Sequence, residues 1–330
     1  MTSLPHGARF GRYEIEAHVG ASDTGDLYQA RDTKPDRDVA LMVLPDEIAH
    51  DPESLSRLEA EIRILASLNH PNIAAISGLE RAGGQLALVL EPIDAPTLAE
   101  RIARGPIPLE EALPIARQIA DALEAALEAG VIHGDLTPSN VRVSADGTVK
   151  VTGIGVAPAI DAAHRDERRP PRTPADTRVP VGTAAYLSPE QVRGMPRDKR
   201  ADTWAFGCLL YEMLTGRRAF RGGAISQTLA KVLETLPDLD ALPKDTPEPV
   251  RQLLQRCLEK NGRQRLQHIG DARVVIEQIA PDAGDAKAET TPRRHRKGRR
   301  FTGLGVAVIA AVALGVTFWI WPVPDQTRGS

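Results

Sequence analysis

The periodicity of the sequence changes at Pro92, and this change limits the folds that the chain can adopt. Across residues 12–44, short runs of alternating apolar and polar residues are broken by Gly and Asp, as is typical of strands in hairpins. Residues 51–68 carry apolar side chains at helical spacing, and two further strands are expected at 72–80 and 85–91. The chain beyond Pro92 has mainly helical periodicity. The sequence therefore predicts an α+β chain with a small β-rich lobe, one main helix in that lobe, and a larger helical lobe.

A long loop is expected to interrupt the helical part. Residues 157–182 are rich in Pro and Arg, and loops of this length in a compact domain are usually functional or disordered. Helices are expected on both sides of it, at 97–104, 109–129, 202–214, 225–234, 249–259 and 271–279.

The C-terminal part contains a different kind of segment. From Phe301 to Pro324 no residue is charged, and about 20 apolar residues span a bilayer as a helix. Trp319 and Trp321 are placed as interfacial anchors, and the basic run at 293–300 predicts a cytoplasmic N-terminal part. We predict a transmembrane helix at 301–323. A buried core helix is the alternative, and binding of anionic lipid is a second interpretation of the basic run.

Composition excludes some classes of protein. The chain has 330 residues, of which 42% are hydrophobic and 26% charged, so it is not expected to be disordered. A formal net charge of −3 gives no reason to expect nucleic-acid binding. The two cysteines, Cys208 and Cys257, lie in apolar helical runs and are expected to be buried free thiols, a single disulfide being the alternative.

The stretch VIHGDLTPSN (131–140) has the composition of a catalytic loop. It places Asp135 and Asn140 five residues apart on a turn that contains Pro and follows an apolar run. That spacing suits a proton acceptor and a metal ligand. No cation lies within the stretch to bind a phosphate group.

Eight motifs in order give the chain a family resemblance. The chain resembles a Ser/Thr protein kinase domain, similar to the bacterial eukaryotic-like kinases that carry one membrane helix, over about residues 13–279. The motifs that carry the resemblance are HVGASDTGDLYQA, DVALMVL, RLEAEIRILASLNHPNI, VIHGDLTPSN, VKVTGIGVA, GTAAYLSPEQ, ADTWAFGCLLYEMLTG and CLEKNGRQRL. The resemblance implies ATP and Mg²⁺ as cofactors, and 157–182 as the activation segment.

The glycine-rich loop departs from the family pattern. Gly20, Gly25 and Leu27 match it, but Ser22 replaces the middle glycine, where the backbone of the family approaches phosphate. Asp23 places a carboxylate at the tip of the loop. A plain hairpin is an equally good interpretation of this segment.

The resemblance assigns two charged groups to the nucleotide site, and only one is present. On the third strand Ala40 matches, but Met42 occupies the position of the ATP-binding lysine. Glu61 on the following helix has therefore lost its usual partner. We expect Met42 to fill the core and Glu61 to be solvated or to find another donor.

The catalytic and metal-binding positions are only partly retained. In the catalytic loop, Asp135 and Asn140 match the proton acceptor and a metal ligand, whereas Gly134 and Thr137 replace an arginine and a lysine. In the metal-binding tripeptide, Gly153 replaces the aspartate and cannot coordinate an ion. Thr173, Thr177 and Thr183 could still be phosphorylated.

The adenine pocket is also altered. Glu91 and Ile93 occupy the positions whose backbone pairs with adenine in the family, with Pro92 between them. Arg142 occupies the position of the leucine beneath the ring, which weakens the apolar slot.

The scaffold positions are retained. His133 belongs to the catalytic-loop motif, and Asp202 matches the residue that holds the backbone of this loop. Glu190 and Arg265 match a buried ion pair.

These observations lead to one topology and to two main alternative functions, with a nucleotide-sensing switch that binds ATP without metal as a third. The predicted segments are an N-lobe at 12–93, a C-lobe at 94–280, a basic linker at 281–300, the membrane helix at 301–323 and an external tail at 324–330. We expect a single-pass membrane protein with a cytoplasmic pseudokinase domain that binds protein partners, such as an active kinase or its substrates. The alternative is an active or weakly active ATP-dependent Ser/Thr kinase.

Overall fold

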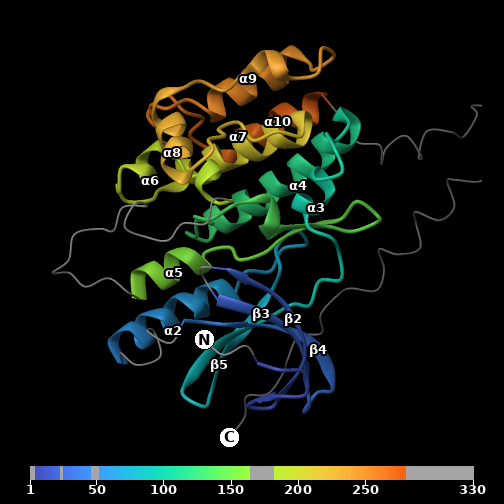
Figure 1. Cartoon of the computed structure of the whole chain (residues 1–330), viewed down its shortest axis with the longest axis vertical. Coiled ribbons are helices and arrows are strands. Elements are labelled where there is room, and N and C mark those ends of the chain that lie inside the picture. The colour runs from blue at the N-terminus through green and yellow to red at the C-terminus, as the bar shows by residue number, and fades with distance from the viewer. Residues whose placement is uncertain (1–3, 23–24, 46–51, 164–181, 280–330) are drawn as a thin grey trace, which may run out of the picture. The chain divides into compact units, whose positions relative to one another are not determined.

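The computed structural model describes residues 4–22, 25–45, 52–163 and 182–279. The first part of this chain forms a six-stranded antiparallel sheet and one helix (Figure 1). Its elements are β1 (Arg9–Phe10), β2 (Tyr13–Ser22), β3 (Gly25–Asp32), β4 (Arg37–Val43), α2 (Pro52–Ala66), β5 (Ile76–Ala82) and β6 (Gln85–Leu90).

The six-stranded sheet and α2 form the N-lobe, and the side chains of β4 alternate between its two apolar clusters. The strand order is β1-β2-β3-β4-β6-β5, so β4 lies inside the sheet. Leu41 and Val43 are buried with Phe10, Tyr13 and Tyr28 on one face of the sheet. Met42 projects to the other face. There it packs against the apolar cluster that α2 forms with β5 and β6.

The N-lobe begins earlier than the predicted boundary at residue 12. Leu4 and Ala8 pack against the cluster around Phe10, and β1 pairs with β2. The backbone N–H of Gly7 donates to Ile15 O at 2.8 Å. Pairing with a strand later in the sequence, which local periodicity does not reveal, therefore adds this segment to the sheet.

The second part of the chain is mainly helical, as predicted. Its elements are α3 (Leu98–Ile102), α4 (Leu109–Glu128), η1 (Pro138–Asn140), β7 (Val141–Val143), β8 (Val149–Val151), α5 (Val156–Ala163), η2 (Ala184–Tyr186), α6 (Pro189–Val192), α7 (Lys199–Thr215), α8 (Ile225–Glu234), η3 (Leu239–Ala241), α9 (Glu248–Cys257) and α10 (Ile269–Ile279).

Helix α7 is the central element of this C-lobe. Every residue from Ala201 to Leu214 is buried, as expected of a helix with neighbours on all sides. Helices α4 and α9 pack against it, and α10 packs against both of these. Cys208 and Cys257 are buried free thiols in this core, as predicted. Burial raises the pKa of both thiols, that of Cys257 to about 12.

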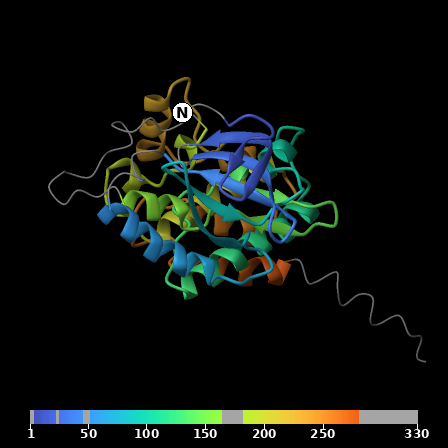
Figure 2. The same cartoon turned by 90° about the horizontal axis from the view of Figure 1, so that it is seen from below.

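Backbone hydrogen bonds connect the two lobes. The N–H of Ala74 donates to Val151 O at 2.9 Å, and the N–H of Val151 donates to Asn72 O at 2.8 Å. Residues 91–97 form the covalent connection, which we call the interlobe segment. Figure 2 shows the sheet of the N-lobe in front of the C-lobe helices.

The start of the predicted loop at 157–182 is helical, so that expectation was wrong for its first residues. Helix α5 covers Val156–Ala163. It lies alongside α2 in Figures 1 and 2. Val156, Ala159 and Ile160 are buried in the same apolar cluster as residues of α2. This contact joins segments about 100 residues apart, which is why the Pro- and Arg-rich local sequence did not predict it.

Among the described residues, no helix is long and apolar enough to cross a membrane. The predicted membrane helix at 301–323, the linker at 281–300 and the tail at 324–330 lie outside the described residues. Thr173 and Thr177 also lie outside them.

Candidate functional site

The catalytic-loop segment, residues 131–140, is held by the central helix of the C-lobe. The carboxylate of Asp202, on α7, accepts a hydrogen bond from the backbone N–H of His133 at 2.7 Å and another from that of Gly134 at 2.8 Å. All three residues are buried. A carboxylate that accepts two backbone N–H groups fixes the path of the loop.

Burial determines the protonation of two groups in this loop. It lowers the pKa of His133 to about 4, so the imidazole is neutral at pH 7. The ring nitrogen Nδ1 of His133 accepts a hydrogen bond from the N–H of Asp135 at 3.3 Å. Burial raises the pKa of Asp202 to about 6, and its two backbone hydrogen bonds oppose this rise.

Asp135 and Asn140, the retained residues of the catalytic-loop motif, lie together. The side-chain amide of Asn140 donates to the backbone carbonyl of Asp135 at 2.7 Å. Asp135 is half-buried and lines a cavity with Thr183, Gln191 and Asp202. This cavity has room for about one water molecule and is too small for a nucleotide.

The wall of the site formed by β4 carries no cation at the predicted position. Met42 is half-buried and packs in the apolar cluster of α2, as expected of a core filler. Glu61 is exposed on α2. The acidic group is therefore solvated, in agreement with the expectation from the missing lysine.

The glycine-rich segment forms the β2–β3 hairpin, where Leu27 pairs with Gly20 on one side and Met42 on the other. Ala40, two residues before Met42 on β4, pairs with Gln29. Packing explains the presence of Gly25. A Cβ atom there would lie 2.2 Å from Val43 O, at a φ of +145° that favours glycine.

The residues present do not fit the magnesium site of a protein kinase. Gly153 has no ligand atom in its side chain, so the aspartate position of the family offers no carboxylate to Mg²⁺. Asn140 is the remaining side chain at a predicted metal position. There is space for a side chain here, because a Cβ atom on Gly153 would have no neighbour within 4 Å, but the φ of +73° at this position favours glycine.

Two cations lie beneath the interlobe segment. Arg142 and Lys150 are direct partners across the β7–β8 ribbon, so their side chains project from the same face. Arg142 Nη1 donates to the carbonyl of Ala95 at 2.9 Å, and Lys150 Nζ lies 3.0 Å from a carboxylate oxygen of Glu91. Ile93, between the two acceptors, is half-buried. Arg142, at the position predicted for the adenine floor, and its neighbour Lys150 are thus both bonded to the interlobe segment.

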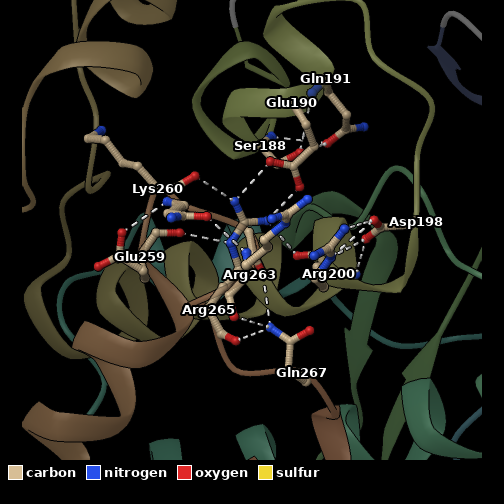
Figure 3. Close-up of polar contacts among 12 residues, drawn as sticks. Ser188, Glu190, Gln191, Asp198, Arg200, Glu259, Lys260, Arg263, Arg265 and Gln267 are labelled. Carbon is tan, nitrogen blue, oxygen red and sulfur yellow. Dashed lines mark hydrogen bonds and ion pairs between the residues drawn. The ribbon is translucent and has the colours of Figure 1, made fainter.

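The predicted scaffold pair is formed in the C-lobe (Figure 3). Arg265, 1% exposed, makes a bidentate contact with Glu190, with Nη1–Oε1 at 2.5 Å and Nη2–Oε2 at 2.8 Å. Burial acts to raise the pKa of Glu190, but the hydrogen bonds and charge of Arg265 outweigh it and leave this pKa below its ordinary value. Arg265 also donates to the backbone carbonyls of Glu259 and Arg200.

Sequence reasoning missed three residues that shape the site. Lys150 binds Glu91, Pro158 of α5 lies against Gly134, and Arg197 pairs with Asp161. Gly134 was a sequence signal for Pro158 and Arg197, because both side chains lie where a side chain at position 134 would be. Glycine leaves that space free. Nothing in the local sequence marked Lys150, since strands commonly carry one exposed cation.

Comparison with solved structures defines the class of fold. The crystal structure of the kinase domain of Mycobacterium tuberculosis PknI superposes with a TM-score of 0.64 at 22% identity, covering 84% of this chain and 99% of that one. A single-site mutant of the same PknI domain gives a TM-score of 0.66. The two-lobed architecture is therefore the protein kinase fold, as predicted.

Sequence relatives then define the family. The protein kinase domain family matches residues 13–278. Serine/threonine-protein kinase PknA of M. tuberculosis is 33% identical over 314 residues, which cover 93% of this chain and 68% of PknA. PknL of the same organism is 32% identical, covering 86% of this chain and 71% of PknL. A probable serine/threonine-protein kinase PknB of Lactococcus lactis is 34% identical over 77% of this chain and 40% of that protein. The chain belongs to the protein kinase family, among the bacterial eukaryotic-like Ser/Thr kinases.

Proposed function

We propose that this chain is a membrane-tethered pseudokinase that acts by binding protein partners, such as an active kinase or its substrates, and does not transfer phosphate efficiently. The observation that carries the proposal is the loss of both charged groups that the family uses to bind the phosphates and Mg²⁺ of ATP. Met42 is an apolar core residue where the family has its lysine, and Gly153 offers no ligand where the family has its aspartate.

Charge balance is the physical reason. Phosphoryl transfer depends on positioning and on neutralising the negative charge of the phosphates, and the groups that do this act together. Without them, ATP at the family's nucleotide site would have neither a lysine on β4 nor a carboxylate to hold Mg²⁺. Arg142 adds a steric argument, because its side chain lies on the adenine floor and is bonded to Ala95.

The contacts that stabilise the C-lobe are retained, and this favours a binding role. Asp202 holds the catalytic-loop segment, and the Glu190–Arg265 pair ties α6 to the segment between α9 and α10. These contacts maintain a C-lobe surface without performing chemistry. The predicted membrane segment at 301–323 would keep this surface at the membrane, on the cytoplasmic side.

An active or weakly active Ser/Thr kinase is the second candidate. Asp135 is retained, and the backbone on both sides of it is fixed by Asp202 and by Asn140. The relatives PknA, PknL and PknB are all named serine/threonine-protein kinases. ATP and Mg²⁺ would be the cofactors of this activity.

A nucleotide titration separates the two candidates. The purified full-length chain is heated with increasing ATP, with and without Mg²⁺, and incubated separately with labelled ATP. The pseudokinase proposal expects no metal-dependent shift in the melting temperature and no phosphate incorporation. Metal-dependent stabilisation, together with incorporation that Asp135→Asn abolishes, would establish the kinase instead.

A restored variant provides the positive control. In the double variant Met42→Lys, Gly153→Asp, both missing groups return, and the Cβ atom at position 153 meets no neighbour within 4 Å, although its φ of +73° is strained for Asp. We expect this variant to gain a Mg²⁺-dependent thermal shift with ATP. Adding Arg142→Leu should strengthen the gain if the floor is occluded.

A further inference from the structure

Helix α5 is packed against the N-lobe through contacts that leave no spare room. Its residues Val156 and Ile160 are buried in the apolar cluster of α2, which includes Leu65. A Cβ atom on Gly155, which precedes the helix, would lie 2.6 Å from Leu65 Cδ2 and 2.8 Å from Val131 Cγ1. This close approach and the φ of +71° at Gly155 together favour glycine.

The same helix lies against the catalytic-loop segment. Gly134 has a φ of +75°, and a Cβ atom there would lie 2.6 Å from Pro158 Cγ and 3.1 Å from Pro158 Cδ. Any side chain at position 134 would therefore have to displace α5. The glycine makes the present position of the helix possible.

An arginine from another part of the chain completes this contact. Arg197 lies in the segment before α7, and its Cδ is 3.6 Å from the Cβ position of Gly134. Its Nη1 is buried from solvent and lies 2.5 Å from Oδ2 of Asp161 on α5, an ion pair without the alignment of a hydrogen bond. Asp161 is 57% exposed at its side chain, and Arg197 is 29% exposed.

The backbone on both sides of Arg197 is held by hydrogen bonds within the C-lobe. Asp198, the next residue, caps α7 by accepting from the N–H of Arg200 and also binds the guanidinium of Arg200. The backbone N–H of Met195 donates to Glu190 O at 2.9 Å. The guanidinium of Arg197 therefore projects from a rigid support onto the end of α5.

We propose that Arg197 is a positioning residue that anchors helix α5, the first part of the activation segment, against Gly134 by pairing with Asp161. The anchor uses a carboxylate of the chain itself and so needs no phosphate group. This inference does not rest on the proposed function, because none of its contacts involves nucleotide or metal.

Hydrogen–deuterium exchange of the full-length chain tests this anchor. Arg197→Gln and Asp161→Asn should each raise the exchange rate of amides 156–163 about two- to fivefold, as expected for a partly exposed ion pair. Exchange of α7 and α9 should not change. Arg193→Gln is the matched control, because Arg193 is exposed in the same segment and should leave α5 unchanged.

A charge swap and a glycine pair complete the test. Arg197→Asp combined with Asp161→Arg should restore the slow exchange of α5. Gly134→Ala should release α5 more than Arg197→Gln does, whereas Gly147→Ala, which has a similar φ of +85° but no neighbour within 4 Å, should not. Equal exchange in wild type and Arg197→Gln, a swap that fails to restore protection, or a rise shared by α5, α7 and α9 would each overturn the proposal.

Discussion

Glu190 and Asp202 are two largely buried carboxylates whose charges the protein compensates in different ways. Glu190 has the full charge of Arg265 against it, and its pKa lies below the ordinary value despite burial. Asp202 has two backbone N–H groups, and its pKa stays raised at about 6. The paired Arg265 therefore outweighs the effect of burial on the pKa of Glu190, whereas the two N–H groups and the charge of Arg197 do not outweigh it at the more deeply buried Asp202.

Removing the cation of the first pair should be costly. We expect Arg265→Ala to lower the free energy of unfolding by about 3–5 kcal/mol, because Glu190 would keep a buried charge without a partner. Chemical denaturation followed by circular dichroism measures this loss. Arg31→Ala is the control, since Arg31 pairs with Asp36 and Asp38 at the exposed surface and should have a much smaller effect. Similar losses in the two variants would contradict the structural role of Arg265.

The buried imidazole gives a pH-dependent prediction. His133 has a folded-state pKa of about 4, below the ordinary 6.5, so below pH 6.5 the unfolded chain binds a proton that the folded chain excludes. The stability advantage of wild type over His133→Gln should therefore shrink by about 3 kcal/mol as the pH falls from 6.5 to 4. Denaturation of both proteins at several pH values measures this difference.

Asp202 acts in the opposite direction over nearly the same range. Its folded-state pKa of about 6 exceeds the ordinary 3.8, so its protonation stabilises the folded chain as the pH falls below 6. Asp202 is present in both proteins and should largely cancel in the comparison. Parallel stability curves for wild type and His133→Gln would show that the imidazole is not held neutral.

At the scale of elements, the close contact between α7 and α9 depends on one glycine. A Cβ atom on Gly207 of α7 would lie 2.7 Å from Cys257 Cβ and 3.1 Å from Leu258 side-chain atoms. The Cys257 Cβ is attached directly to the backbone of α9 and cannot rotate away. The distance between the two helices is therefore set by the absence of a side chain at 207.

Gly207→Ala should destabilise the chain although alanine is the better helix former. The gain in helix propensity is about 1 kcal/mol, whereas overpacking costs about 1–3 kcal/mol and here meets a rigid neighbour. Gly270→Ala on α10 is the matched control. Its Cβ would meet Glu124 Oε1, the flexible end of a side chain that can move aside. Thermal denaturation should show a lower melting temperature for Gly207→Ala than for Gly270→Ala, and the reverse order would be inconsistent with a rigid α7–α9 contact.

At the scale of the whole molecule, side chains of the C-lobe reach the interlobe segment. Lys150 on β8 binds Glu91, and the Glu91 carboxylate in turn accepts from the N–H of Ala75 at 3.0 Å. Arg142 on β7 binds Ala95. These contacts tie the interlobe segment to the C-lobe, at the position where protein kinases bind adenine.

The membrane proposal is tested on the 330-residue chain in cells. The full-length protein should sediment with membranes and resist extraction by alkaline carbonate, because about 20 apolar residues at 301–323 are enough to span a bilayer. A chain ending at residue 300 should move to the soluble fraction. Release of the full-length protein by carbonate would mean that this segment does not span the membrane.

The sequence alone established the fold family and the missing chemistry. Eight motifs in order predicted two lobes, and six helices of the C-lobe (α3, α4, α7, α8, α9 and α10) were placed within a few residues of their observed ends. The losses at Met42 and Gly153 could also be read directly, because a thioether carries no positive charge and a glycine no ligand in any fold. The identity of a side chain sets its chemistry before its position is known.

Tertiary structure decided where the remaining groups point. Arg142 and Lys150 reach the interlobe segment, and Arg197 reaches α5, through contacts between residues tens of positions apart. Helix α5 itself forms where the local sequence predicted a loop, because burial against α2 outweighs its weak helical signal. Such contacts depend on which surfaces the folded chain brings together. The local pattern of a sequence does not show how far apart two distant residues lie in space.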